Sequence, residues 1–127
     1  MDKEVLIKRV LDCAIIVRKA LSPGYVEKVY ENALMVELLK AGINARQQVP
    51  IEVKYEGHVV GNYFADILVE DCVVVELKAV QELNEAHQAQ LVNYLTATGL
   101  DDGLLINFGN EEKIQVKRKY RIYKPKV

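Results

Sequence analysis

Asp66 and the triplet Glu76-Leu77-Lys78 place charged side chains in the most apolar part of the chain. Asp66 ends an apolar stretch, and ten residues later Glu76 and Lys78 interrupt a run of β-branched residues. Burying an unpaired carboxylate or ammonium group is costly, so these charges need partners. Side chains two apart in a strand face the same side, so Glu76 and Lys78 project together. Leu77 points into the core and can offer its backbone carbonyl.

The turn that follows Asp66 decides whether it joins the other two. A three-residue loop over residues 70–72 pairs position 66 with 76, whereas a two-residue turn pairs it with 75 and reverses its face. If the groups converge, two carboxylates and a carbonyl form a hard oxygen site that suits Mg²⁺ or Mn²⁺. Lys78 would then orient or deprotonate a metal-bound water that attacks a phosphodiester. The alternative is a buried salt-bridge cluster without metal.

The elements that position these residues follow from the spacing of apolar side chains. Helical spacing over 4–21 stops at Ser22-Pro23-Gly24, and a second helix over 25–40 ends before Gly42. From Val49 the period changes to two, which predicts strands over 49–55 and 58–69 around a turn at Glu56-Gly57. The run 72–78 is apolar enough to lie centrally in a sheet.

The remaining segments complete one α/β domain over residues 1–127. Asn84 is a suitable N-cap for a helix that runs to Thr98 and closes at Gly99. The segment 104–108 reads as another buried strand, and 114–123 alternates basic with apolar residues as an exposed edge strand does. The order is helix, helix, three strands, helix, two strands.

Length and composition set the class of protein. Half of the 127 residues are apolar, so the chain can bury a core without disulfides. Cys13 and Cys72 lie in apolar runs, and we expect reduced core thiols. The N-terminus lacks the basic start of a signal peptide and no run is long enough to span a membrane, so the expected location is cytoplasmic.

The C-terminal stretch is basic, although the chain as a whole carries a net charge of −1. Seven basic and no acidic residues lie from Lys113 onward, so the preceding 112 residues carry −8. Such a stretch could contact phosphates, and the candidates within it are Lys117, Arg118, Lys119 and Arg121. A solvated edge strand that its lysines keep from aggregating is the alternative.

Residues 24–30 read GYVEKVY and continue as ENAL. This segment resembles the motif that names the GxxExxY family of the PD-(D/E)XK nuclease superfamily. Further motifs follow in the same order, namely Asp66, the Glu76-Leu77-Lys78 strand, Gln90 with Tyr94, and residues 103–109. The superfamily name refers to a proline before the aspartate, and here Ala65 takes that place. The resemblance implies a restriction-endonuclease-like core with a three-stranded antiparallel meander, in one mixed sheet flanked by helices.

The resemblance also implies roles for single residues. Asp66 and Glu76 would be metal ligands, together with the Leu77 carbonyl, and Lys78 would be the catalytic lysine. Glu27, on the helix before the sheet, would complete the metal shell. Without the resemblance, Glu27 reads as an ordinary exposed glutamate.

Gln90 and Tyr94 are four residues apart and therefore share one face of a helix, with His87 one turn earlier. The pair resembles the Q-x-x-x-Y element of exonuclease-like members, which helps to position the scissile strand. His87 is a candidate phosphate contact. The structural alternative is a half-buried Tyr94 beside a surface Gln90.

These observations favour a Mg²⁺- or Mn²⁺-dependent nuclease that hydrolyses phosphodiester bonds, with DNA as the expected substrate. The alternative is a catalytically silent module of the same fold that binds nucleic acid or a protein partner. The exposed last strand also leaves a homodimer open. Other enzyme classes find no support, because the sequence has no Gly-rich phosphate loop, Cys/His metal spacing or G-x-S-x-G elbow.

Overall fold

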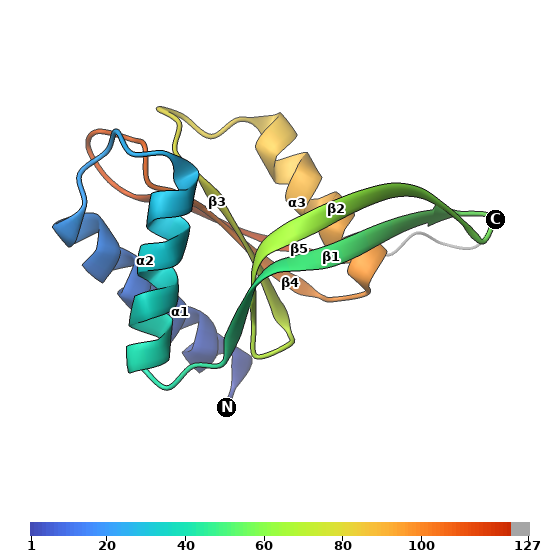
Figure 1. Ribbon diagram of the computed structural model, residues 1–127, viewed down its shortest axis with the longest axis horizontal. Coiled ribbons are helices and arrows are strands. Elements are labelled where there is room, and N and C mark those ends of the chain that lie inside the picture. Colours follow the sequence, from blue (N-terminus) through green and yellow to red (C-terminus); the bar gives the residue numbers. More distant parts are fainter. Residues whose placement is uncertain (123–127) are drawn as a thin grey trace.

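The computed structural model describes residues 1–122, which form a mixed sheet with helices on both faces (Figure 1). The helices are α1 (Lys3–Ala20), α2 (Glu27–Lys40) and α3 (Glu85–Thr98). The strands are β1 (Ala45–Tyr55), β2 (His58–Val69), β3 (Val73–Lys78), β4 (Asp102–Asn107) and β5 (Gln115–Tyr120), in the order β1-β2-β3-β4-β5. Only the β3–β4 pair among them is parallel. The predicted α/β class and element order are confirmed.

The helices begin and end where local chemistry favours it. The Asp2 side chain caps α1 by accepting a hydrogen bond from the Glu4 amide at 2.9 Å. Asn84 caps α3 in the same way, and Gly99 closes it in the left-handed conformation at φ 73°. None of the helices in residues 1–122 is long and apolar enough to cross a membrane. Tyr123, Lys124 and Lys126, which the sequence assigns to the last strand and basic stretch, lie outside the described residues.

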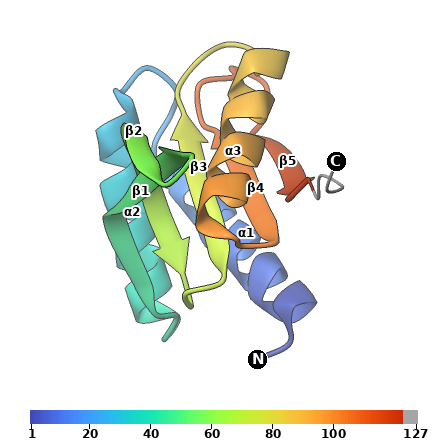
Figure 2. The ribbon, with the colours of Figure 1, turned by 90° about the vertical axis from the view of Figure 1, so that its right-hand side faces the viewer.

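Each face of the sheet has its own apolar core. Helices α1 and α2 cover one face through Val10, Leu34 and their neighbours, whereas α3 covers the other through Leu91 and Leu95 (Figures 1 and 2). β3 lies between the two cores and is buried along almost its whole length, as predicted for a central strand. Both cysteines are free thiols, but only Cys13 is a core residue, because Cys72 lies half-buried in the turn before β3.

The β2–β3 turn has the longer of the two loops that the sequence allowed. Ile67 pairs with Val75 and Val69 with Val73, which leaves residues 70–72 as the loop. Glu70 and Asp71 adopt positive φ angles of 50° and 55° to make this turn. Position 66 therefore lies beside 76 rather than 75.

The β1–β2 hairpin changes face at residues 48 and 66. Ala45 and Ile67 pack in the core under α1 and α2, whereas Val49 and Ala65 pack in the core under α3. β1 starts at Ala45, before the predicted Val49, because pairing with β2 extends the strand through a polar segment that has no alternating pattern. Beyond this point the hairpin extends past β3 as a two-stranded arm (Figure 1).

Candidate metal and catalytic site

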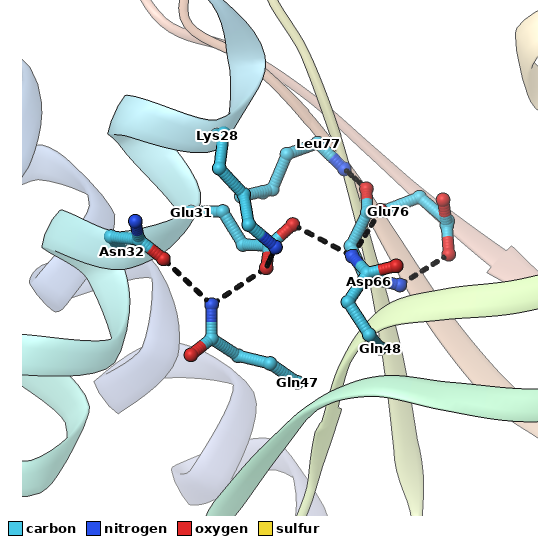
Figure 3. Close-up of polar contacts among 8 residues, drawn as sticks. All are labelled: Lys28, Glu31, Asn32, Gln47, Gln48, Asp66, Glu76 and Leu77. Carbon is cyan, nitrogen blue, oxygen red and sulfur yellow. Dashed lines mark hydrogen bonds and ion pairs between the residues drawn. The ribbon is translucent and has the colours of Figure 1, made fainter.

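Asp66 and Glu76 meet where the backbone ladder between β2 and β3 ends. The Asp66 amide donates to Glu76 Oε1 at 3.0 Å, and the Leu77 amide donates to Asp66 Oδ2 at 2.8 Å (Figure 3). The N–H and C=O groups of one residue in an antiparallel strand point to the same side, so the Leu77 carbonyl also faces Asp66. The structure thus brings three of the predicted site groups together.

Glu76 is the most strongly perturbed acid of the site. Its side chain is only 5% exposed. Burial, followed by the nearby negative charge of Asp66, raises the pKa of Glu76 to about 9, and Lys78 opposes this shift. A cation between the two carboxylates would favour the charged form of both. Perturbation of this kind is frequent in functional sites.

Glu31 is an acid of the site that the sequence reasoning missed. It lies on α2 and is 3% exposed. Lys28 Nζ and Gln47 Nε2 hold its Oε2 at 2.9 and 2.6 Å, and Gln48 Nε2 donates to its Oε1 at 3.0 Å (Figure 3). Gln48 Nε2 also lies 3.4 Å from Asp66 Oδ1, which links the helix acid to the strand acids.

The structure places Glu27 outside this cluster. It is the first residue of α2, its side chain is exposed, and it has no hydrogen bond or ion pair within residues 1–122. Glu31 follows one turn later on the same side of the helix and reaches the sheet instead. A signal for Glu31 was present in the sequence, because it lies on one stripe with Leu34 and Leu38.

Lys78 ends β3 and is half-buried. Its ammonium group has no hydrogen bond or ion pair among the described residues, so it is available to a substrate or water. The chain around it is firmly held: the Phe108 amide donates to the Lys78 carbonyl at 2.9 Å. The buried Asn107 also bonds both backbone groups of Val80, at 3.0 and 2.7 Å.

The donor set fits a hard divalent cation. Residues 1–122 contain no group of three His, Cys, Asp or Glu side chains arranged as a metal cage. Mg²⁺ does not need one, because it keeps several waters and takes one or two carboxylates with substrate phosphates. Asp66, Glu76 and the Leu77 carbonyl supply oxygen ligands of this type.

Comparison with protein families identifies a family for nearly the whole chain. The family model described as the PD-(D/E)XK nuclease superfamily matches residues 4–119. The chain belongs to the PD-(D/E)XK nuclease superfamily. Comparison with curated proteins finds no match.

Two solved structures share the fold of this superfamily member. The crystal structure of a protein designated SSO0001 has 20% identity and a TM-score of 0.57, over 77% of this chain and 52% of that one. The alkaline exonuclease LHK-Exo from Laribacter hongkongensis has 12% identity and a TM-score of 0.55, over 75% of this chain and 56% of that one. The chain therefore spans about half the length of these two structures. Their likeness confirms the restriction-endonuclease-like fold.

Gln90 and Tyr94 of this nuclease-superfamily fold lie together on α3. Both line a groove of about 1220 Å³ between α3 and the β1–β2 arm. The Tyr94 ring lies 5.6 Å from that of Tyr63. Burial, and then the charges of Glu76 and Asp66, raise the pKa of Tyr94 to about 12, so its phenol stays protonated. The same charge effects show that Tyr94 lies near the acids, and it is buried rather than half-buried.

His87 stabilises the start of α3 through hydrogen bonds with Asn84. Its Nδ1 accepts a hydrogen bond from the Asn84 amide at 3.2 Å, and its own amide donates to Asn84 Oδ1 at 2.9 Å. This capping box holds the start of α3. The predicted phosphate contact would have to use the other ring nitrogen.

The basic residues of the edge strand β5, and Arg121 directly after it, differ in what they contact. Arg118 binds Glu4 and Asp102 at 2.7 and 2.8 Å, and Arg121 binds Asp101 at 3.0 Å. Lys119 donates to Gln88 at 3.1 Å. Lys117 is exposed and has no such contact in the described part of the chain. The two arginines therefore serve the fold, and Lys117 is the residue of the four that is open to a ligand.

Proposed function

We propose that this chain is a metal-dependent nuclease that hydrolyses phosphodiester bonds, with DNA as the expected substrate. The observation that carries the proposal is the hydrogen-bonded pairing of Asp66 with Glu76 and Leu77, next to Lys78 at the end of β3. Membership of the PD-(D/E)XK nuclease superfamily supports it. The GYVEKVY segment supports the narrower assignment to the GxxExxY family. The nuclease domain that we propose comprises residues 1–127.

Asp66, Glu76 and the Leu77 carbonyl would hold Mg²⁺ or Mn²⁺, and Glu31 takes the place that the resemblance gave to Glu27. A divalent cation there supplies Lewis-acid chemistry at the phosphate. The ammonium group of Lys78 would donate a hydrogen bond to the attacking water or to a phosphate oxygen.

On α3, the protonated phenol of Tyr94 would donate a hydrogen bond to the bound nucleic acid. Gln90 would orient the nucleic-acid strand in the groove between α3 and the arm. Lys117 adds a phosphate contact from the edge of the sheet, with Lys119 beside it.

Purified protein incubated with single- and double-stranded DNA and RNA in Mg²⁺ or Mn²⁺ tests the proposal. We expect cleavage by the wild type and a loss of at least about a hundredfold in Asp66→Ala, Glu76→Ala and Lys78→Ala. Asp12→Ala is the control, because Asp12 is an exposed acid of α1 outside the groove. Equal inertness of the wild type and all variants on every substrate would sink the enzyme proposal.

One observation favours a second candidate, a catalytically silent module that binds nucleic acid or a protein partner. With a pKa near 9, Glu76 is protonated at neutral pH without a cation, so the cluster can persist as a structural one. This candidate predicts nucleic-acid binding that falls steeply with salt, is independent of metal and survives Lys78→Ala.

A further inference from the structure

Gln48 has an unusual backbone for its place in the fold. Four residues other than glycine have positive φ in the described chain, and three of them, Glu56, Glu70 and Asp71, lie in turns. Gln48, at φ 52°, lies within β1, between the pairs that residues 47 and 49 form with β2. It therefore stands opposite Asp66. A left-handed conformation is unfavourable for a side chain such as Gln and persists only where the surroundings enforce it.

This conformation aims the Gln48 side chain at the site. Its Nε2 donates to Glu31 Oε1 at 3.0 Å and lies 3.4 Å from Asp66 Oδ1. In residues 1–122 the other partners of Glu31 are Lys28 and Gln47, and those of Asp66 are backbone or side-chain groups of β3. Gln48 is thus the partner that the helix acid and the strand acid share (Figure 3).

We propose that Gln48 is a positioning residue of the metal site, which links the carboxylates of Glu31 and Asp66 and so holds both acids in place for a divalent cation. Two carboxylates repel each other, and an amide that donates to both offsets this repulsion. Groups that hydrogen-bond metal ligands commonly set metal affinity by ten- to a hundredfold. The inference rests on the proposed function, because it assumes that the acids bind metal.

Gln47 provides a matched control from the same strand. Its Nε2 donates to Glu31 Oε2 at 2.6 Å and to Asn32 Oδ1 at 2.9 Å, and it has no hydrogen bond to Asp66. In Gln47→Ala, Lys28 still holds Oε2 of Glu31, and Gln48 still joins Glu31 to Asp66. Gln47→Ala therefore distinguishes two explanations of a loss in metal affinity. Either any lost contact to Glu31 lowers the affinity, or the link between Glu31 and Asp66 is required.

The experiment measures Mn²⁺ binding to the full chain by titration calorimetry, for the wild type, Gln48→Gly, Gln48→Ala and Gln47→Ala. Gly accepts a positive φ without strain, so Gln48→Gly should melt no lower than the wild type while it loses the link. We expect both Gln48 variants to bind Mn²⁺ about tenfold or more weakly. The Mg²⁺ concentration for half-maximal cleavage should rise by the same factor. Gln47→Ala should weaken Mn²⁺ binding less than either Gln48 variant does, because Lys28 still holds Glu31 Oε2 and the link to Asp66 is intact.

The outcomes separate this inference from the proposed function. If the wild type binds Mn²⁺ and Gln48→Gly binds it equally well, the role of Gln48 is refuted while the metal site stands. If Gln47→Ala weakens binding as much as Gln48→Gly, the link to Asp66 is not what matters. If the wild type binds no Mn²⁺, both proposals fall.

Discussion

Asp66 is tied to Glu76 through its own backbone, because its amide donates to Glu76 Oε1 at 3.0 Å. In return, the amide that follows Glu76 donates to the Asp66 carboxylate. Hydrogen bonds of the two acid side chains therefore replace the next backbone pair between β2 and β3. The separation of the two acids thus depends on strand register as well as on side-chain rotamers.

Glu76→Gln is expected to stabilise the metal-free protein at neutral and alkaline pH. The folded pKa of Glu76 is raised to about 9 from 4.5, so its contribution to stability is complete below pH 4.5 and is lost as the pH rises through 9. A neutral amide avoids this loss. Melts in EDTA should show a gain of several degrees at pH 9 and little gain near pH 4.5.

The same variant should lose the response to metal. Mg²⁺ should raise the melting temperature of the wild type, because a ligand of the folded state stabilises it, but not that of Glu76→Gln. The exposed Glu52→Gln serves as the control for the change of charge. A Glu76→Gln protein that melts below the wild type at pH 9 would contradict the assignment.

Glu31→Gln and Glu27→Gln compare two acids one turn apart on α2. Glu31 is buried in the cluster and Glu27 is exposed, so the first variant should lower Mn²⁺ affinity and cleavage by about tenfold or more. The second should stay close to the wild type in both. The reverse order would restore the role that the resemblance gave to Glu27.

Asp102→Asn tests the charge cluster that joins the start of α1 to β4 and β5. Burial opposes ionisation of Asp102, but hydrogen bonds from Lys3 and Arg118 outweigh it and hold its pKa below the usual 3.8. Its stabilisation is therefore present above pH 3.8 and is lost as the pH falls through the lower folded value.

We expect Asp102→Asn to lose about 1–3 kcal/mol at pH 7, since it leaves charged partners that are partly exposed. The difference from the wild type should shrink in acid. Urea unfolding at pH 7 and pH 3 measures this. An equal difference at both pH values would mean that packing rather than charge is responsible.

Lys117→Ala and Arg118→Ala distinguish ligand binding from folding on β5. Lys117 is exposed, so its loss should weaken nucleic-acid binding and reduce the salt slope by about one, with no change in melting temperature. Arg118 binds Glu4 and Asp102, so its loss should lower the melting temperature. Salt-dependent binding and thermal melts of both variants are the measurements.

Strand alternation placed Glu76 and Lys78 on one face, because alternation is a local property. The sequence allowed two loop lengths after β2, so only the observed register shows that Asp66 lies beside Glu76. The sequence also predicted the start and end of α3 through Asn84 and Gly99, where capping chemistry is local as well.

Glu31 was missed because Glu27 shares its side of the helix. The stripe with Leu34 and Leu38 hinted at Glu31, but the packing of α2 on the sheet shows that it is the acid that reaches the strands.

Gln48 had no signal in the sequence. A left-handed residue inside a strand depends on what surrounds it, and neither β-propensity nor hydrophobic period reports it. The basic residues of β5 were ambiguous for a related reason. Their charges are visible in the sequence, but the acids of α1 and β4 that neutralise Arg118 become its neighbours only in the fold.

The change of face at Gln48 and Asp66 divides the hairpin into two parts that can evolve separately. Residues on the sheet side fix the acids, whereas the arm packs through Ile51 in the core under α3 and lines the groove along that helix. Lengthening both strands of the arm by two residues each preserves the register below it. A longer or shorter arm would therefore reshape the groove along α3 without moving Asp66 or Glu76.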